Sequence, residues 1–65
     1  MFNNLSAEQK RINLTNQEVA NYLGISRVTY ERKKRYGTFN VTQINKLCKL
    51  FNCTYDYLFE TKFKA

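Results

Sequence analysis

A helix stop and a helix start lie two residues apart near the middle of the chain, and they restrict the fold more than any other feature. Thr15 is typical of a helix N-cap, and Glu18 three residues later completes a capping box. Gly24 is typical of a helix C-terminus, and Ser26 can cap the helix that follows. Two helices joined by a tight turn containing glycine form a helix-turn-helix, so the sequence predicts this motif.

The rest of the chain carries helix signals of the same kind. Asn40 and Gln43 make a second capping box, and the apolar residues that follow are spaced as on one face of a helix. Thr54 can cap a last helix, and no segment alternates convincingly as a strand would. The expected helices cover about 3–12, 16–22, 27–35, the segment from Val41 to Phe51 and a last segment through Phe59. The sequence therefore predicts an all-α fold, with residues 1–65 as a single domain.

The size and composition of the chain exclude several classes of function. With 65 residues and no histidine, it lacks the commonest general base and has little room for an enclosed active site. Its carboxylates are scattered without the spacing of metal ligands. We therefore expect no enzyme, no cofactor, no metal site and no small-molecule substrate. The formal net charge of +6 is typical of a nucleic-acid-binding domain.

Cys48 and Cys53 lie inside apolar patterns and are too few to bind a metal by themselves. The favoured interpretation is that both are reduced core residues, and a short-loop disulfide is the alternative. No apolar run approaches the roughly 18 residues of a transmembrane helix, and the start of the chain does not resemble a signal peptide. The expectation is a cytoplasmic protein without a membrane partner.

Residues 14–30, with Glu-Val-Ala at 18–20 and Leu-Gly-Ile-Ser at 23–26, resemble the Cro/cI-type (lambda-repressor-like) helix-turn-helix family. The downstream segments at 47–48, 51–54 and 58–59 match the same family pattern. The resemblance covers about residues 5–60 and leaves 61–65 as a short basic tail. It implies a compact five-helix DNA-binding domain with a central helix-turn-helix. It also implies a transcriptional regulator, often of phage origin.

The second helix of the motif, at 27–35, is the one expected to enter the major groove, where its N-terminal residues approach base edges. Arg27 can donate two hydrogen bonds to guanine, and Val28 or Thr29 can contact a thymine methyl group. Glu31 either accepts a hydrogen bond from cytosine or, in the favoured interpretation, pairs with Arg27 or Arg35. The predicted base contacts are Arg27, Val28, Thr29, Glu31 and Arg32.

Segment 27–35 holds +4 of the net charge of +6, because it contains five Lys and Arg residues and one Glu. On a helix that enters the groove, such charge is expected to meet phosphates, which supply most of the affinity. The resemblance adds Asn16, because the family often has a phosphate-contacting glutamine at this position; a plain helix-start residue is the equal alternative. The predicted phosphate contacts are Asn16, Lys33, Lys34 and Arg35.

The sequence departs from the family pattern at the end of the same helix. Lys34 and Tyr36 stand where the family commonly has glutamate and glycine, and they leave the orientation of the basic end open. Gly37 can cap the helix one residue later and so lengthen or reshape its end. Lys33 occupies a position that is usually half-buried, so its aliphatic stem is expected to lie along the protein with its ammonium in water.

The chain has ten aromatic residues, five Tyr and five Phe, which are more than a core of this size needs. Tyr30 and Phe51 fit core positions, and Tyr22 is expected to be half-buried. The C-terminal group could complete the core and lie flat on the surface, or it could form a protein interface. The candidate interface residues are Tyr55, Tyr57, Phe59 and Phe63.

The leading hypothesis is a sequence-specific regulator that binds a double-stranded DNA operator as a homodimer, because symmetric operators imply two-fold symmetric proteins. The alternative is a phage-type antirepressor or modulator that binds a partner repressor protein through the same helix-turn-helix. The positive charge of segment 27–35 disfavours the alternative, because a helix that faces protein has no general need for it.

Overall fold

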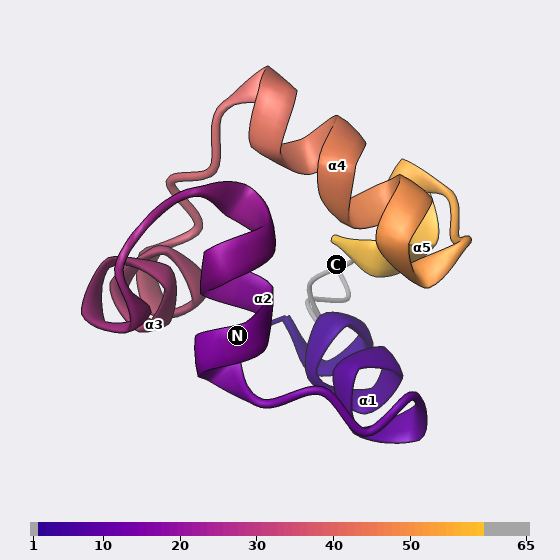
Figure 1. Ribbon diagram of the computed structural model, residues 1–65. Helices are drawn as coiled ribbons and strands as arrows, with labels where there is room; N and C mark the ends of the chain where they lie inside the picture. The colour runs from indigo at the N-terminus through magenta and orange to yellow at the C-terminus, as the bar shows by residue number, and fades with distance from the viewer. Residues whose placement is uncertain (1, 60–65) are drawn as a thin grey trace.

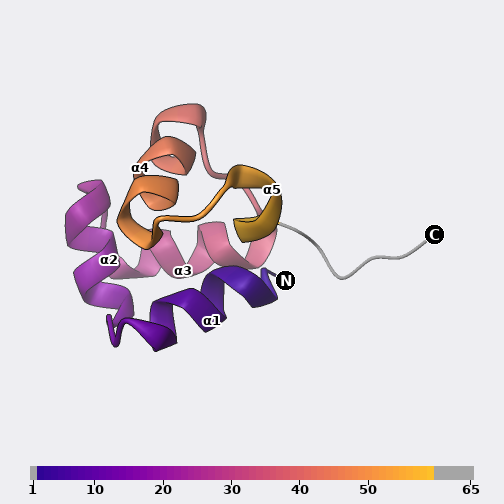
Figure 2. The same ribbon diagram turned by 90° about the vertical axis from the view of Figure 1, so that its right-hand side faces the viewer.

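The computed structural model describes residues 2–59, which form five α-helices and no strand within that range (Figures 1 and 2). The helices are α1 (Asn3–Arg11), α2 (Asn16–Leu23), α3 (Arg27–Tyr36), α4 (Val41–Phe51) and α5 (Tyr55–Leu58). Helix α2 packs against α3, while α5 packs against both α1 and α4. The all-α prediction is confirmed for this part of the chain.

The helix boundaries follow the capping signals of the sequence. The Thr15 hydroxyl accepts from the Glu18 backbone N–H at 3.1 Å, and the Glu18 carboxylate accepts from the Thr15 backbone N–H at 2.8 Å. The same reciprocal pair joins Asn40 and Gln43 at the start of α4. Gly37 adopts the left-handed conformation, with φ of 69°, one residue after α3 ends. The predicted lengthening of this helix is therefore confirmed.

The Thr15 cap gives a stability prediction. Thr15→Ala removes the acceptor for the Glu18 backbone N–H and breaks the capping box, so it is expected to lower the free energy of unfolding by about 0.5–2 kcal/mol. Thr15→Ser keeps a hydroxyl at the same place and serves as the matched control. Urea denaturation followed by circular dichroism measures both variants. Equal losses for alanine and serine would show that the hydroxyl does not cap α2.

Each of the five helices contributes to one hydrophobic core, which places the helix-turn-helix on a fixed support. The fully buried side chains are Leu5, Val19, Ala20, Tyr30, Leu47, Phe51 and Leu58. Tyr30 of α3 and Phe51 of α4 occupy the core positions predicted for them, whereas Tyr22 is 43% exposed. Because Tyr30 projects from the middle of α3 into this core, the face of the helix on which it lies cannot turn toward solvent.

Cys48 and Cys53 are free thiols, partly buried against the core. Burial raises the pKa of both thiols, which reduces the fraction of reactive thiolate. The favoured interpretation of these residues as small core side chains agrees with this arrangement, and the alternative disulfide is not formed.

Aromatic rings join the N-terminal segment, the α3–α4 connection and the end of α5. The Phe59 ring lies edge-on to Phe2 and Phe39, with centroid distances of 5.3 and 5.7 Å, and it also contacts Tyr55 at 5.6 Å. Phe39 in turn contacts the Tyr30 ring at 6.0 Å. These contacts connect the middle of α3 to the rest of the molecule through packed rings rather than through the backbone alone.

Candidate nucleic-acid interface

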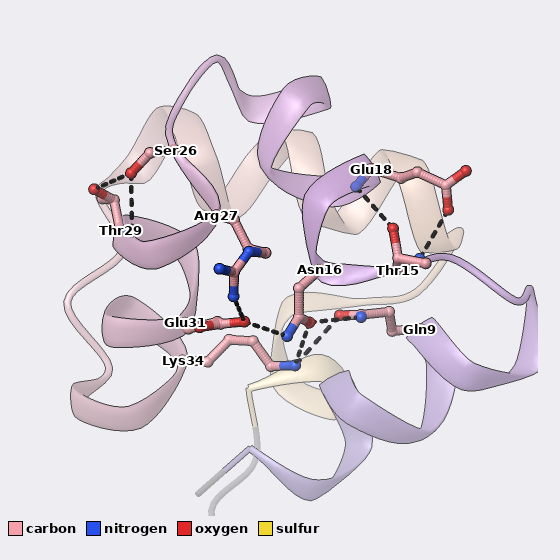
Figure 3. Close-up of polar contacts among 9 residues, drawn as sticks. All are labelled: Gln9, Thr15, Asn16, Glu18, Ser26, Arg27, Thr29, Glu31 and Lys34. Atoms are coloured by element: carbon pink, nitrogen blue, oxygen red, sulfur yellow. Dashed lines mark hydrogen bonds and ion pairs between the residues drawn. The ribbon is translucent and has the colours of Figure 1, made fainter.

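Helices α2 and α3 are joined by a tight turn that exposes the first residues of α3. Gly24 ends α2 in the left-handed conformation, with φ of 76°. Ser26 then caps α3: its hydroxyl oxygen accepts from the Thr29 backbone N–H at 3.1 Å and donates to the Thr29 hydroxyl at 2.8 Å (Figure 3). The cap fixes the direction in which α3 leaves the turn, while Val28 stays 54% exposed.

We call the exposed surface of α3 its outer face. It carries the cationic side chains of Arg32 and Arg35 and the exposed side chains of Val28 and Tyr36. An open depression of about 230 Å³ on this face is lined by Val28, Glu31, Arg32, Arg35 and Tyr36. Tyr36 is 64% exposed. Lys33 is half-buried, as expected, whereas its ammonium, which was expected in water, donates to the Thr38 carbonyl at 3.2 Å. Of the predicted base contacts, Val28, Glu31 and Arg32 thus lie together on this open surface.

Glu31 forms the ion pair with Arg27 that was the favoured interpretation of this residue. Its Oε2 accepts from the Arg27 guanidinium Nη1 at 2.9 Å and from the Asn16 amide Nδ2 at 3.0 Å (Figure 3). The hydrogen bond from Asn16, followed by the one from Arg27, holds the pKa of the Glu31 carboxyl below its ordinary value. Within residues 2–59, the other carboxylate oxygen of Glu31 takes no hydrogen bond, so it can still accept one from a ligand.

Two of the predicted phosphate contacts, Asn16 and Lys34, are half-buried and contact other protein groups, although both also line an open depression with Arg35. The Lys34 ammonium lies 3.3 Å from the Gln9 side-chain oxygen and 3.4 Å from the Asn16 oxygen, and 5.2 Å from the centre of the Tyr30 ring. Burial lowers the pKa of Lys34, and the Glu31 carboxylate partly opposes this shift. Contact with a phosphate would require this ammonium to leave both oxygens. Arg35, in contrast, is exposed. The phosphate contacts themselves stay predictions.

The sequence-based prediction missed Gln9, a residue of α1 that is only 8% exposed. Its amide oxygen accepts from the buried Tyr30 hydroxyl at 2.7 Å. Its amide nitrogen donates to Asn16 Oδ1 at 2.8 Å, as Figure 3 shows. The signal that could have found it is its position four residues after Leu5, on the buried side of α1. Gln9 thus links the first helix to both helices of the motif.

The candidate interface residues near α5 separate into exposed and packed side chains. Tyr55 is 56% exposed and Tyr57 is 41% exposed, and the Tyr57 hydroxyl donates to the Glu8 carboxylate at 3.1 Å. Phe59 is partly buried in the ring contacts described above. Phe63 lies outside the described residues. The predicted interface stays untested, with Tyr55 and Tyr57 as its exposed members.

A capped α2, a tight glycine-containing turn and a cationic α3 with an exposed outer face define a helix-turn-helix DNA-binding domain. In a comparison with known families, residues 4–64 match the Cro/C1-type helix-turn-helix DNA-binding domain. The chain belongs to this family, and the resemblance predicted from sequence is confirmed. The family is a type of DNA-binding regulator rather than of enzyme. No curated protein and no solved structure matched the chain.

Residues 2–59 offer neither a metal-binding cluster nor a membrane-spanning helix. No group of three or more His, Cys, Asp or Glu side chains in this part of the chain could hold a metal ion. Its helices are all too short or too polar to cross a membrane.

Proposed function

We propose that this protein is a sequence-specific transcriptional repressor of the Cro type, from a phage or prophage, that acts in the bacterial cytoplasm. It places α3 in the major groove of double-stranded DNA. The observation that carries the proposal is the outer face of α3, where exposed Val28 and Arg32 lie with Glu31, the carboxylate that pairs with Arg27 at the start of the helix. An aliphatic side chain and guanidinium groups match the thymine methyl group and the acceptor edge of guanine.

The charge distribution supports DNA as the ligand of α3. Arg32 and Arg35 are exposed on the outer face, and the helix segment 27–35 carries +4 of the net charge. Phosphates on either side of the groove would meet these cations and release condensed counterions. A helix with this charge is poorly suited to bind another protein unless that partner is strongly acidic. The repressor hypothesis is therefore favoured over the antirepressor hypothesis.

Selection of DNA from a randomised duplex pool tests the proposal. The protein is expected to enrich one sequence family, and its affinity for an enriched duplex should exceed its affinity for a scrambled duplex by about 10³-fold or more at physiological salt. Equal affinity for both duplexes would contradict sequence-specific binding. An enriched duplex placed between a promoter and its start site should then lower transcription in vitro, whereas increased transcription would contradict the repressor role.

Substitutions of the neighbouring cations Lys34 and Arg35 are expected to change the salt dependence of DNA binding by different amounts. Arg35→Ala should weaken binding to all sequences alike and reduce the slope of log K against log salt by about 0.9, the value for one phosphate contact. Lys34→Ala should reduce the slope less, because the Lys34 ammonium already lies against the Gln9 and Asn16 oxygens. Binding titrations over a range of potassium chloride concentrations measure both. A larger effect at Lys34 would show that its ammonium turns outward on DNA.

We infer that the protein binds its operator as a homodimer, with Tyr55 and Tyr57 in the contact between the two copies. Both side chains are exposed, and tyrosine is enriched at protein interfaces. Sedimentation equilibrium at high micromolar concentration should give the mass of two chains, and Tyr55→Ser should shift the equilibrium toward the monomer. Tyr22→Ser, at an exposed tyrosine of α2, is the matched control. A wild-type protein that sediments as a monomer would contradict this inference.

A further inference from the structure

We propose that Gln9, which lies on α1 outside the helix-turn-helix, is a positioning residue for sequence recognition: its amide determines how Arg27 is presented to DNA. The inference rests on the proposed function and deepens it. Gln9 makes no contact with Arg27 itself. It acts through Asn16 and Glu31, which join α1 to the first turn of α3 by a continuous chain of hydrogen bonds (Figure 3).

The orientation of the Gln9 amide is fixed by groups that can bond in only one way. The Leu14 backbone carbonyl can only accept, and it takes a hydrogen bond from Gln9 Nε2 at 3.1 Å. The oxygen Oε1 of Gln9 accepts from the Tyr30 hydroxyl at 2.7 Å and lies 3.3 Å from the Lys34 ammonium, which can only donate. An amide turned by 180° would face its NH₂ toward the ammonium and its oxygen toward the carbonyl.

The orientation of the Gln9 amide determines the orientation of the Asn16 amide. Gln9 Nε2 has two hydrogens, and the second is donated to Asn16 Oδ1 at 2.8 Å. The Lys34 ammonium lies 3.4 Å from the same oxygen and favours the same arrangement. With its oxygen held on this side, Asn16 must direct its NH₂ group to the other side. That group donates to Glu31 Oε2 at 3.0 Å.

Glu31 connects Asn16 to Arg27, the side chain that is predicted to contact bases. Its Oε2 receives hydrogen bonds from both Asn16 and Arg27, so the carboxylate is held on one side and holds the guanidinium on the other. Both Glu31 and Arg27 are partly exposed and would otherwise sample several rotamers. If the Asn16 amide turned over, its oxygen would face the carboxylate and repel it. Arg27 would then lose its fixed partner, and base recognition would lose the benefit of a preset side chain.

A pair of variants with equal charge tests the role of Gln9. Tyr30→Phe deletes the buried hydroxyl and its hydrogen bond to Gln9, but the Leu14 carbonyl still orients the amide. The double variant Gln9→Met with Tyr30→Phe lacks the amide as well. The double variant removes the buried Tyr30 hydroxyl together with the Gln9 amide. The Leu14 carbonyl and Asn16 Oδ1 lose a donor, but both residues are half-buried and water can replace it, so the double variant should fold. The two proteins therefore differ in the amide of Gln9 and not in the buried hydroxyl.

The readout is discrimination between bases on the duplex that the wild-type protein enriches. At the base pair where Arg27→Ala loses its preference, the double variant should lose about tenfold of its discrimination, and Tyr30→Phe alone should stay within about twofold of wild type. A residue with a merely structural role would lower stability without changing this ratio. Equal discrimination by the double variant and Tyr30→Phe would overturn the proposal.

A second measurement needs no DNA and separates this inference from the proposed function. In ¹⁵N-labelled free protein, the Asn16 side-chain NH₂ and Arg27 side-chain resonances should shift in the double variant and not in Tyr30→Phe. Unchanged resonances would contradict the chain of contacts, even if DNA recognition were demonstrated. If the wild-type protein enriched no sequence, the proposed function would fail, and the role of Gln9 in base recognition would fail with it. Shifted resonances would then show only that Gln9 orients Arg27.

A third variant keeps an acceptor for Tyr30 and Lys34, at the cost of a carboxylate oxygen that faces the half-buried Leu14 carbonyl. Gln9→Glu introduces a carboxylate beside the Lys34 ammonium and the Tyr30 hydroxyl, both of which can donate to it. The carboxylate cannot donate to Asn16, so the Asn16 amide should turn over and present its oxygen to Glu31. The same loss of discrimination is expected. Gln17→Glu, at an exposed position of α2, controls for the added charge and should weaken all sequences alike. Discrimination in Gln9→Glu equal to that in Gln17→Glu would overturn the proposal.

Discussion

Phe51→Ala is expected to lower the free energy of unfolding by about 3–5 kcal/mol, because it removes a large buried ring from the core. Phe51 ends α4 and is only 1% exposed, so little room exists for the core to collapse around the missing ring. A domain of this length has a total stability of roughly 3–10 kcal/mol. The substitution should therefore leave much of the protein unfolded at 37 °C, as thermal melting followed by circular dichroism would measure.

Val41→Ala is the matched control for this substitution. Val41 begins the same helix but is 72% exposed, so shortening it should change the free energy of unfolding by less than about 0.5 kcal/mol. Similar melting temperatures for the two variants would contradict the described packing of α4 against the core. The comparison also guards against effects of helix propensity, because both substitutions introduce alanine into α4.

Arg27→Ala is expected to remove the preference for one base pair of the enriched duplex, at a cost of about 1–3 kcal/mol in binding free energy. The reason is the position of Arg27 at the first turn of α3, the part of a recognition helix that approaches base edges. The side chain is 52% exposed, and its one ion pair within residues 2–59 is with Glu31, so stability should change little. Competition binding against duplexes altered at each position in turn measures the effect.

Lys49→Ala removes the same charge from the last turn of α4 and serves as the control for Arg27→Ala. It should leave the order of preference among duplexes unchanged, with at most a small and uniform loss of affinity. A uniform loss for Arg27→Ala as well would mean that Arg27 contacts phosphate rather than a base. In that event Arg32, which lies on the outer face beside Val28, would become the principal candidate for base recognition.

The helix boundaries could be predicted from the sequence because each depends on residues close in the chain. Thr15 with Glu18, and Asn40 with Gln43, are pairs three residues apart, and a capping box needs nothing beyond them. The left-handed conformation of Gly24 is equally local, since glycine alone adopts it without steric cost. The resemblance to a known family then supplied the arrangement of the helices, which the local signals do not contain.

The polar contacts of the site could not be predicted in the same way. Gln9 and Tyr30 are separated by 21 residues, and Gln9 and Lys34 by 25, so no local pattern connects them. In sequence, Lys34 is one member of a basic run and is expected to point outward. In the fold it lies one turn after the buried Tyr30, and the ring and the Gln9 oxygen draw its ammonium inward. Only the packing of α1 against the motif reveals this orientation.

The hydrogen bonds that run from the Leu14 carbonyl to Arg27 limit how the specificity of this protein could be transferred to another. An engineer who copies the exposed side chains of α3 onto a related scaffold copies the guanidinium but not the support that orients it. A successful chimera would also need glutamine at the position of Gln9 and asparagine at that of Asn16. The part that must be transferred is thus the exposed surface together with the buried amide of Gln9 and the half-buried amide of Asn16.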